Sequence, residues 1–362
     1  MRKTIIILCA AAVLLASLLL LEHDSKTVKA DDYDLKLKAA ELTDRCLKAV
    51  REIKEEKGIP INEAADINRT GLIGEDYSFI TTTLGELAAK RTSVNPNMAA
   101  VVVDMFHELG LKKGDRIAVN CSGSFPALNI AVMCAAEVLE LDVIQMSSFG
   151  SSTHGANNPE LTYPDMEYEL LSRGLLFHKS DYVSIGGIED LGKEMPDEIV
   201  KTVLARLEEK GYPLLYHEDL SDNIYKRYEL YTADGEIRCF VNVGGNDVSF
   251  GNSKIIVYSD GGILTELPEK DGSTGLVQLF LKNGIPVIHL LNIKKLAGNY
   301  GLPVDPVPLP APGEGGVYWK TSYPKPLAWA GLALSAAILF AFRAVFANEK
   351  EPRRKAGSDK IH

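Results

Sequence analysis

The chain has 362 residues, a formal net charge of -10 and 46% hydrophobic residues. This length suits one large domain or two smaller ones, and the apolar content is sufficient to bury a sizeable core. The acidic balance argues against nucleic acid as a partner, because binding to its backbone needs clustered lysine and arginine.

The five cysteines show no C-x-x-C spacing, so the sequence signals neither a zinc site nor a disulfide framework. We interpret them as small buried hydrophobes, which is the ordinary role of a free cysteine. They are Cys9, Cys46, Cys121, Cys134 and Cys239.

The first membrane candidate is the apolar run from Thr4 to Leu21, which follows Arg2 and Lys3. Its length of about eighteen residues is enough to span a bilayer, so residues 1–22 are predicted to form an N-terminal anchor. A cleaved signal peptide is the alternative, with small residues around Ala30 at the cleavage position. The run is longer than a typical signal core and Ala30 lies far beyond its end, which favours an uncleaved anchor.

A second apolar run over residues 327–346 is predicted to be a C-terminal transmembrane helix, followed by a basic tail over residues 347–362. Positive charges therefore flank the outer ends of both spans. The positive-inside rule then predicts that both termini are cytoplasmic and that the middle of the chain is extracytoplasmic.

Alternating apolar patterns predict a run of helices and strands over residues 32–302. Helices are expected over 33–57, 98–109, 126–138, 166–173, 196–210, 220–231, 275–282 and 293–297. Strands are expected over 117–120, 142–146, 182–185, 214–216, 237–243, 254–258 and 286–290, and 78–84 is either a short strand or a helix start. Strands that alternate with helices predict an α/β domain with a mostly parallel sheet flanked by helices.

The strand–helix–strand unit over residues 117–146 predicts where a ligand would bind. In an open parallel sheet, ligands lie beyond the carboxyl ends of the strands. The polar loops Cys121–Phe125 and Ser147–Asp165 both leave from that edge. After the domain, the Pro-rich residues 303–316 are expected to form a semi-rigid strut of about 30 Å, at about 3.1 Å per residue.

Three interpretations are open for the turn Ser122-Gly123-Ser124, which lies between a strand and a helix. Ser124 could cap the helix, the turn could bind an anion at the helix N-terminus, or Ser124 could be a nucleophile at a strand–turn–helix elbow. Against the last, the motif G-x-S-x-G is absent, because Pro126 stands where glycine is expected.

A nucleophilic Ser124 would need a base and an acid. The order Ser124, Asp247, His289 matches the triad order of α/β-hydrolases, although three residues of a long chain match some order by chance. His289 lies between Ile288 and Leu290 and is expected to be a core histidine rather than a base.

The polar loop that follows the second strand is the other candidate site, because long polar loops in compact domains are often functional. Its side chains could form a hydrogen-bonding wall, or a purely structural loop with Asx turns. The candidate residues are Ser147, Ser148, His154, Asn157, Asn158, Glu160 and Asp165. Gly244, Gly245 and Asn246 follow a strand and could present backbone amides to an anion, or form an ordinary turn.

Three segments resemble the poly-γ-glutamate system protein family, which comprises accessory membrane proteins of bacterial poly-γ-glutamate synthesis systems. They are N-N-P-E-L-T-Y-P-D-M-E at Asn157–Glu167, F-V-N-V-G-G at Phe240–Gly245 and P-V-I-H-L-L-N at Pro286–Asn292. The layout of two terminal membrane helices also fits, and the resemblance covers nearly the whole chain. Asn246 departs from it, since the family has a third glycine there.

The resemblance implies a location in the bacterial cell membrane, with poly-γ-glutamate and the membrane subunits of its synthase as partners. It supplies no catalytic residues, and we expect no cofactor beyond a divalent cation bridging the polyanion. Three functions remain open. They are an accessory protein that handles the polymer or holds the synthase, an extracytoplasmic serine hydrolase or transpeptidase acting on the polymer, and a scaffold that does not bind it.

Overall fold

The computed structural model describes residues 2–251, 260–267, 272 and 274–348. The chain divides into two compact units. One unit is formed by the two ends of the chain, residues 1–29 and 319–362, and the other by Ala30–Tyr318. The predicted domain therefore extends beyond residue 302 and includes the whole Pro-rich segment.

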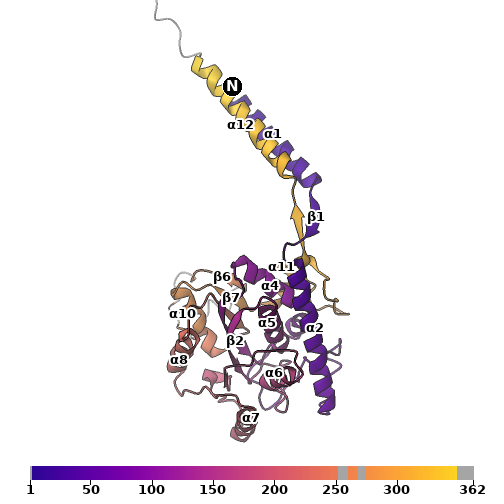
Figure 1. The fold of residues 1–362 in the computed structure, drawn as a ribbon, viewed down its shortest axis with the longest axis vertical. Helices are drawn as coiled ribbons and strands as arrows, with labels where there is room; N and C mark the ends of the chain where they lie inside the picture. The colour runs from indigo at the N-terminus through magenta and orange to yellow at the C-terminus, as the bar shows by residue number, and fades with distance from the viewer. Residues whose placement is uncertain (1, 252–259, 268–271, 273, 349–362) are drawn as a thin grey trace, which may run out of the picture. The chain divides into compact units, whose positions relative to one another are not determined.

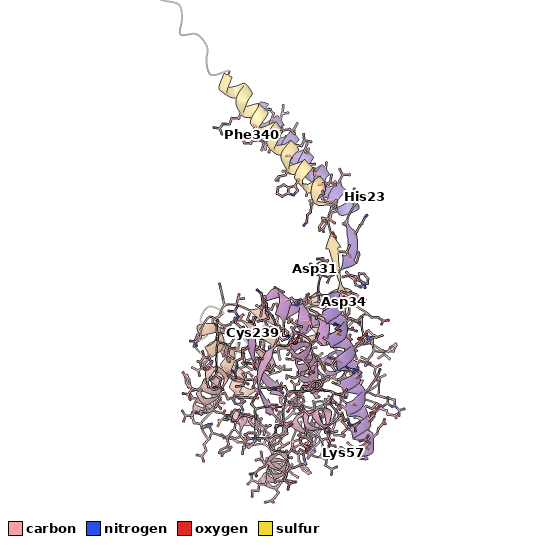
Figure 2. The ribbon with its side chains drawn as sticks, in the orientation of Figure 1. His23, Asp31, Asp34, Lys57, Cys239 and Phe340 are labelled. Carbon is pink, nitrogen blue, oxygen red and sulfur yellow. The ribbon has the colours of Figure 1, made fainter. Side chains whose placement is uncertain are left out.

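The terminal unit contains two long apolar helices, α1 (Arg2–His23) and α12 (Lys325–Asn348). The stretches Thr4–His23 and Lys325–Arg343 are long and apolar enough to cross a membrane. Figure 1 shows the helices side by side, with the start of α1 and the end of α12 at the same end of the pair. Figure 2 marks the opposite end of α1 at His23.

Small side chains allow α1 and α12 to approach closely. The Ser335 hydroxyl donates a hydrogen bond of 3.4 Å to the Ala10 carbonyl, and both residues are buried between the helices. A Cβ atom at Gly331 would collide with the Ser17 side chain. Gly331 and Ser335 are four residues apart, which is the small-residue spacing found at membrane helix contacts.

A short antiparallel ribbon completes the terminal unit. It pairs β1 (Lys26–Lys29) with β8 (Trp319–Ser322), and the register aligns Lys26 with Ser322 and Lys29 with Trp319. The sequence did not predict this ribbon, because neither four-residue segment shows a clear apolar alternation on its own.

The domain Ala30–Tyr318 is built from the following elements. Its helices are α2 (Tyr33–Glu56), α3 (Leu87–Ser93), α4 (Met98–Glu108), α5 (Pro126–Val138), α6 (Tyr163–Ser172), η1 (Ile188–Asp190), α7 (Asp197–Glu209), α8 (Leu220–Thr232), α9 (Asp247–Phe250), α10 (Leu276–Lys282), α11 (Ile293–Asn299) and η3 (Gly316–Tyr318). Its strands are β2 (Arg116–Ser122), β3 (Asp142–Ser148), β4 (Tyr182–Ser184), β5 (Cys239–Val243), β6 (Gly262–Leu264) and β7 (Val287–Leu290).

The strands form one sheet of six in the order β4-β3-β2-β5-β7-β6. All neighbours are parallel except β6, which pairs antiparallel with β7. The chain builds β2, β3 and β4 outward in one direction and then returns to place β5 and β7 on the other side of β2. Strand order therefore reverses between β2 and β5, which is the position where open α/β sheets bind ligands.

Helices cover both faces of this sheet, as the α/β prediction requires (Figure 1). Side chains alternate along β2, so that Ile117, Val119 and Cys121 join one core and Ala118 joins the other. The first core also contains residues of α2, α4, α5, α6 and α11, and the second contains residues of α8, α9 and α10. The apolar stripe of α2 is buried as predicted. Figure 2 labels Asp34 near the start of this helix and Lys57 just after its end.

Most predicted elements are present, and the differences concern short segments. The expected strand over 214–216 is only an isolated bridge between Leu214 and Val183. In the 78–84 segment, Thr81 makes a single bridge to Ser151. The short elements α3 and β6 were not predicted, and the expected strand over 254–258 lies outside the described residues. Of the cysteines, Cys46, Cys121, Cys134 and Cys239 are buried and free, and Cys9 is exposed.

The Pro-rich segment is not the free strut that its composition suggests. Asp305 forms two hydrogen bonds of 2.6 Å with the Arg91 guanidinium, and its backbone N–H donates to the Thr92 hydroxyl. Asn97 donates to the Ala311 carbonyl and accepts from the Gly313 N–H. Tertiary contacts therefore hold residues 303–316 against the domain, where local proline stiffness alone predicts an extended spacer.

Candidate functional site

A hollow opens at the carboxyl edge of the sheet, at the point where the strand order reverses. Its volume is about 380 Å³. We call it the strand-end hollow, because residues that end or follow β2, β3 and β5 line it. The lining residues are Thr82, Thr83, Ser122, Ser124, Ser148, Gly150, Gly187, Ile188, Glu194, Gly245, Asn246, Asp247, Phe250 and Leu291.

A second hollow of about 250 Å³ adjoins the first. Thr83, Ser124, Gly245 and Leu291 line both, so the two hollows adjoin at these residues, and we call the pair the two-lobed groove. We call the second lobe the lysine hollow. Its other lining residues are Leu84, Gly85, Glu86, Ala89, Lys90, Phe125, Ser152, Asn292, Ile293 and Lys294.

The turn after β2 owes its shape to close packing against the loop after β3. A Cβ atom at Gly123 would lie 2.9 Å from the carbonyl oxygens of Phe149 and Gly150, so glycine is needed for this approach. The Ser124 hydroxyl accepts the Ser152 N–H at 3.0 Å, which ties the two loops together. Phe125, not Ser124, is the N-cap residue of α5, so the prediction that Ser124 caps the helix is wrong.

Ser148 contributes a hydroxyl with no hydrogen-bond partner among the described residues. It is the last residue of β3, it is 2% exposed, and it lines the strand-end hollow. A buried hydroxyl without a partner is costly, because it has lost its hydrogen bonds to water. A ligand group in the hollow would satisfy it.

Two carboxylates, Glu194 and Asp247, also line the strand-end hollow, and both hold the loop that contains η1. The Ile188 N–H donates to the Glu194 carboxylate at 3.0 and 3.1 Å, and the Glu189 N–H donates to Asp247 at 2.8 Å. Glu189 and Asp190 have φ values of 53° and 65°, a left-handed conformation that is uncommon for residues other than glycine. The two carboxylates therefore help to fix the wall of the hollow.

A buried polar network continues from the hollow into the sheet. The Asn120 amide donates to the Asn242 oxygen at 3.1 Å and to the Ser249 hydroxyl at 2.9 Å. The Ser249 N–H donates to Asn246, which lines the hollow. Such connected networks rigidify the groups they contain when every member is satisfied.

A buried ion pair also fixes the loop that contains η1. Arg227 of α8 donates to Asp190 at 2.6 Å, and the two side chains are 1% and 2% exposed. Asp190 also accepts the Ser184 hydroxyl at 2.9 Å and the Asn223 amide at 3.0 Å. These extra hydrogen bonds offset part of the cost of removing both charges from water.

Lys90 has no carboxylate partner within the described part of the chain, although it is only 2% exposed. Its Nζ lies 2.7 Å from the Ser152 hydroxyl oxygen, donates to the Ser124 carbonyl, and is 3.8 Å from the centroid of the Phe125 ring. Burial lowers the pKa of Lys90 to about 7, because a charged amine is poorly solvated there.

No family model, curated protein or solved structure matches the chain.

The structure brings together about half of the predicted site residues. Those that line the strand-end hollow are Ser122, Ser124, Ser148, Gly245, Asn246 and Asp247. Gly244 lies next to them, with its backbone N–H bound to the Leu290 carbonyl. The Ser147 hydroxyl lies 2.8 Å from that of Ser180 and does not line the groove.

The remaining loop residues have structural contacts and line neither lobe. The Asn157 side chain brackets the backbone of Glu75, donating to its carbonyl and accepting from its N–H. Asn158 accepts the Glu160 N–H in an Asx turn, and His154 lies 3.6 Å from Asp76. These contacts agree with the structural-loop alternative and not with a polar wall, since the loop folds back onto residues 74–85.

Asp165 is a structural acid at the start of α6. It forms a capping box with Thr162 and accepts hydrogen bonds from Arg206 and Lys210. Burial favours a higher pKa for Asp165, but the hydrogen bonds and charges of Arg206 and Lys210 outweigh it and hold the pKa below its usual range. By contrast, burial raises the pKa of Glu167, against hydrogen bonds from Ser180, Tyr212 and Gln145.

The triad Ser124, Asp247, His289 is not assembled, because in the described structure no hydrogen bond joins any two of these side chains. Asp247 holds the Glu189 N–H, and His289 Nδ1 lies 3.2 Å from the Asn242 amide. His289 is fully buried against Phe250, and burial lowers its pKa to about 4. It is a core histidine, as its apolar neighbours indicate.

Sequence reasoning missed Lys90 and Ser152, which both line the lysine hollow and are in contact. The serine-rich loop is a candidate site from its composition, but no local pattern distinguishes Ser152 from its neighbours. Lys90 lies in the unpredicted helix α3, and the two residues are 62 positions apart in the chain. Groups of three or more His, Cys, Asp or Glu side chains able to hold a metal are absent from the described residues.

Proposed function

We propose that this chain is an accessory membrane protein of bacterial poly-γ-glutamate synthesis, and that its domain binds the polymer in the two-lobed groove outside the membrane. The proposal combines the sequence resemblance with the position, shape and lining of the groove. It also retains the predicted arrangement in which both ends of the chain are cytoplasmic.

The observation that carries the proposal is an extended groove lined by hydroxyl and amide groups, with Ser148 left without a partner. Poly-γ-glutamate presents an amide and a carboxylate in every repeat, and both accept hydrogen bonds. Ser122, Ser124 and Asn246 can supply donors along one lobe. Two adjoining lobes suit a chain molecule, whereas a compact cofactor would need only one.

The apolar helices α1 and α12 would tether the domain to the membrane from which the polymer emerges. The basic residues at the outer ends of both spans support cytoplasmic termini. The membrane subunits of the synthase are the expected protein partners of these helices.

The charge of the protein makes binding short-ranged. The chain carries a net charge of -10, and Glu194 and Asp247 line the strand-end hollow, so a polyanion gains no long-range attraction. A divalent cation bridging these carboxylates and those of the polymer would offset the repulsion. Polymer binding should therefore weaken when divalent cations are chelated.

The test measures binding of poly-γ-glutamate to the full-length protein in detergent micelles, with Mg²⁺ and with a chelator. Ser148→Ala should weaken binding about two- to tenfold, the usual effect of losing one hydrogen bond. Ser147→Ala is the matched control, because this neighbouring hydroxyl faces Ser180 instead of the groove. It should bind like the wild type.

A wild-type protein that does not bind the polymer would contradict the proposal and leave the scaffold function. Equal binding by the Ser148→Ala and wild-type proteins would show that the polymer does not occupy the strand-end hollow.

A further inference from the structure

The lysine hollow contains an amine and a hydroxyl that are in direct contact. Lys90 of α3 and Ser152 of the loop after β3 both line it, and Lys90 Nζ lies 2.7 Å from Ser152 Oγ. The amine also contacts the Ser124 carbonyl and the face of the Phe125 ring. Neither of these groups bears the negative charge that normally accompanies a buried lysine.

In the structure Lys90 donates hydrogen bonds to the Ser152 hydroxyl and to the Ser124 carbonyl. A neutral lysine has two N–H donors and one lone pair. Once Lys90 has lost a proton, one N–H can stay on the Ser124 carbonyl and the other can face the aromatic ring. The lone pair can then accept the Ser152 hydroxyl, which reverses the direction of that hydrogen bond. The lowered pKa of Lys90, about 7, agrees with this arrangement near neutral pH.

The fold holds the pair in place. Gly85 packs against both groups, since a Cβ atom there would lie 2.9 Å from Lys90 Cε and 2.9 Å from Ser152 Oγ. The Ser152 N–H is fixed by the Ser124 hydroxyl at 3.0 Å, and the next residue, Thr153, donates its N–H to the Thr83 carbonyl. Ser152 and Lys90 are 4% and 2% exposed, and both line the lysine hollow.

We propose that Ser152 and Lys90 form a nucleophile–base pair that hydrolyses amide bonds of an extended polar chain bound in the groove. Serine activated by a lysine is a known alternative to the serine–histidine arrangement. This activity goes beyond binding of the polymer. It also differs from the Ser124 hydrolase considered from the sequence, because the nucleophile lies on another loop.

In the first half of the reaction, Lys90 Nζ takes the proton of Ser152 while Oγ attacks the amide carbon. The C–O bond forms, the C–N bond breaks, and the Lys90 ammonium returns the proton to the departing nitrogen. An ester on Ser152 remains. Water then attacks the ester with Lys90 again accepting a proton, and the released Oγ recovers that proton as the carboxylic acid leaves.

The test uses a fluorophosphonate, which forms a covalent bond with activated serines and needs no polymer. Full-length protein in detergent micelles is labelled, and the adduct is located by peptide mass spectrometry. We expect the adduct on Ser152. The labelling rate should rise about tenfold per pH unit at low pH and level off above pH of about 7, as Lys90 loses its proton.

Ser152→Ala and Lys90→Met should both abolish labelling, whereas Ser147→Ala, a buried serine outside the groove, should retain it. Should a variant fail to fold, the pH profile of the wild-type protein still tests the role of Lys90. An adduct on Ser124, no adduct above that of denatured protein, or a labelling rate that does not change between pH 5 and 9 would overturn the proposal. Because labelling needs no polymer, its failure is distinguishable from failure of polymer binding.

Discussion

Burial affects three ionisable side chains of this domain differently. Asp165 is fully buried but satisfied by Arg206 and Lys210, so it stabilises the start of α6. Asp190 pairs with the equally buried Arg227 and fixes the η1 loop. Lys90 has no such partner among the described residues, and its amine is instead available to Ser152. The same cost of desolvation therefore produces two structural contacts and one reactive group.

The lowered pKa of Lys90 predicts a pH dependence of stability. The unfolded chain keeps this lysine protonated up to its ordinary pKa of 10.5, whereas the folded protein releases the proton at about 7. Between these values the unfolded state binds more protons, so the free energy of unfolding should rise with pH. Denaturant unfolding from pH 7 to 10 should show this rise in the wild type. Lys90→Met, measured in parallel, should lack that component, and an equal rise in the variant would contradict a buried, neutral lysine.

Individual segments show how tertiary contacts override local preference. The loop after β3 contains many serine, threonine, asparagine and glycine residues, a composition typical of surface loops. It is instead mostly buried, because Asn157 binds the Glu75 backbone and Ser151 bridges Thr81. The Pro-rich segment likewise has the composition of a spacer, but it is held against the domain. Its Asp305 accepts a hydrogen bond from Arg91 of α3, and its Ala311 carbonyl accepts one from Asn97, the N-cap residue of α4.

Asp305→Ala should release the Pro-rich segment. The two charge-assisted hydrogen bonds to Arg91 are partly shielded from solvent, so their loss should lower the free energy of unfolding by about 1–2 kcal/mol. Residues 303–316 should also become more sensitive to a protease during limited digestion. Glu63→Ala is a suitable control, because its ion pair with Arg69 is exposed and should contribute little. Unchanged digestion of the Asp305 variant would show that other contacts hold the segment.

The chain as a whole predicts a specific membrane topology, since α1 and α12 are apolar and basic residues lie at their outer ends. Leu84 is 88% exposed and belongs to the domain that we place outside the cytoplasm. In intact cells, a Leu84→Cys protein should react with a membrane-impermeant maleimide. The four cysteines within the domain are buried, so background labelling should be low.

A cysteine added after His362 should be labelled only after the cells are opened. Labelling of this C-terminal cysteine in intact cells, or protection of Leu84→Cys, would contradict the proposed sidedness. It would also contradict the extracytoplasmic location of the groove.

Local patterns were sufficient for the class of fold and for much of the site. The stripe of α2 follows from its periodicity, because the helix buries one face. The start of α5 follows from Pro126, and β2, β3 and β5 follow from largely apolar runs, because these strands are buried on both faces of the sheet. The rule that ligands bind at the carboxyl ends of parallel strands then placed Ser122, Ser124, Ser148 and the 244–246 turn at one edge.

The tertiary structure was needed for everything that depends on contacts between distant segments. Strand order, the buried 147–165 loop and the docked Pro-rich segment arise from packing that no single window of sequence contains. The pairing of Lys90 with Ser152 has the same origin. A lysine in a short helix and a serine in a polar loop interact only after folding removes both from water. Folding then places Lys90 Nζ 2.7 Å from Ser152 Oγ.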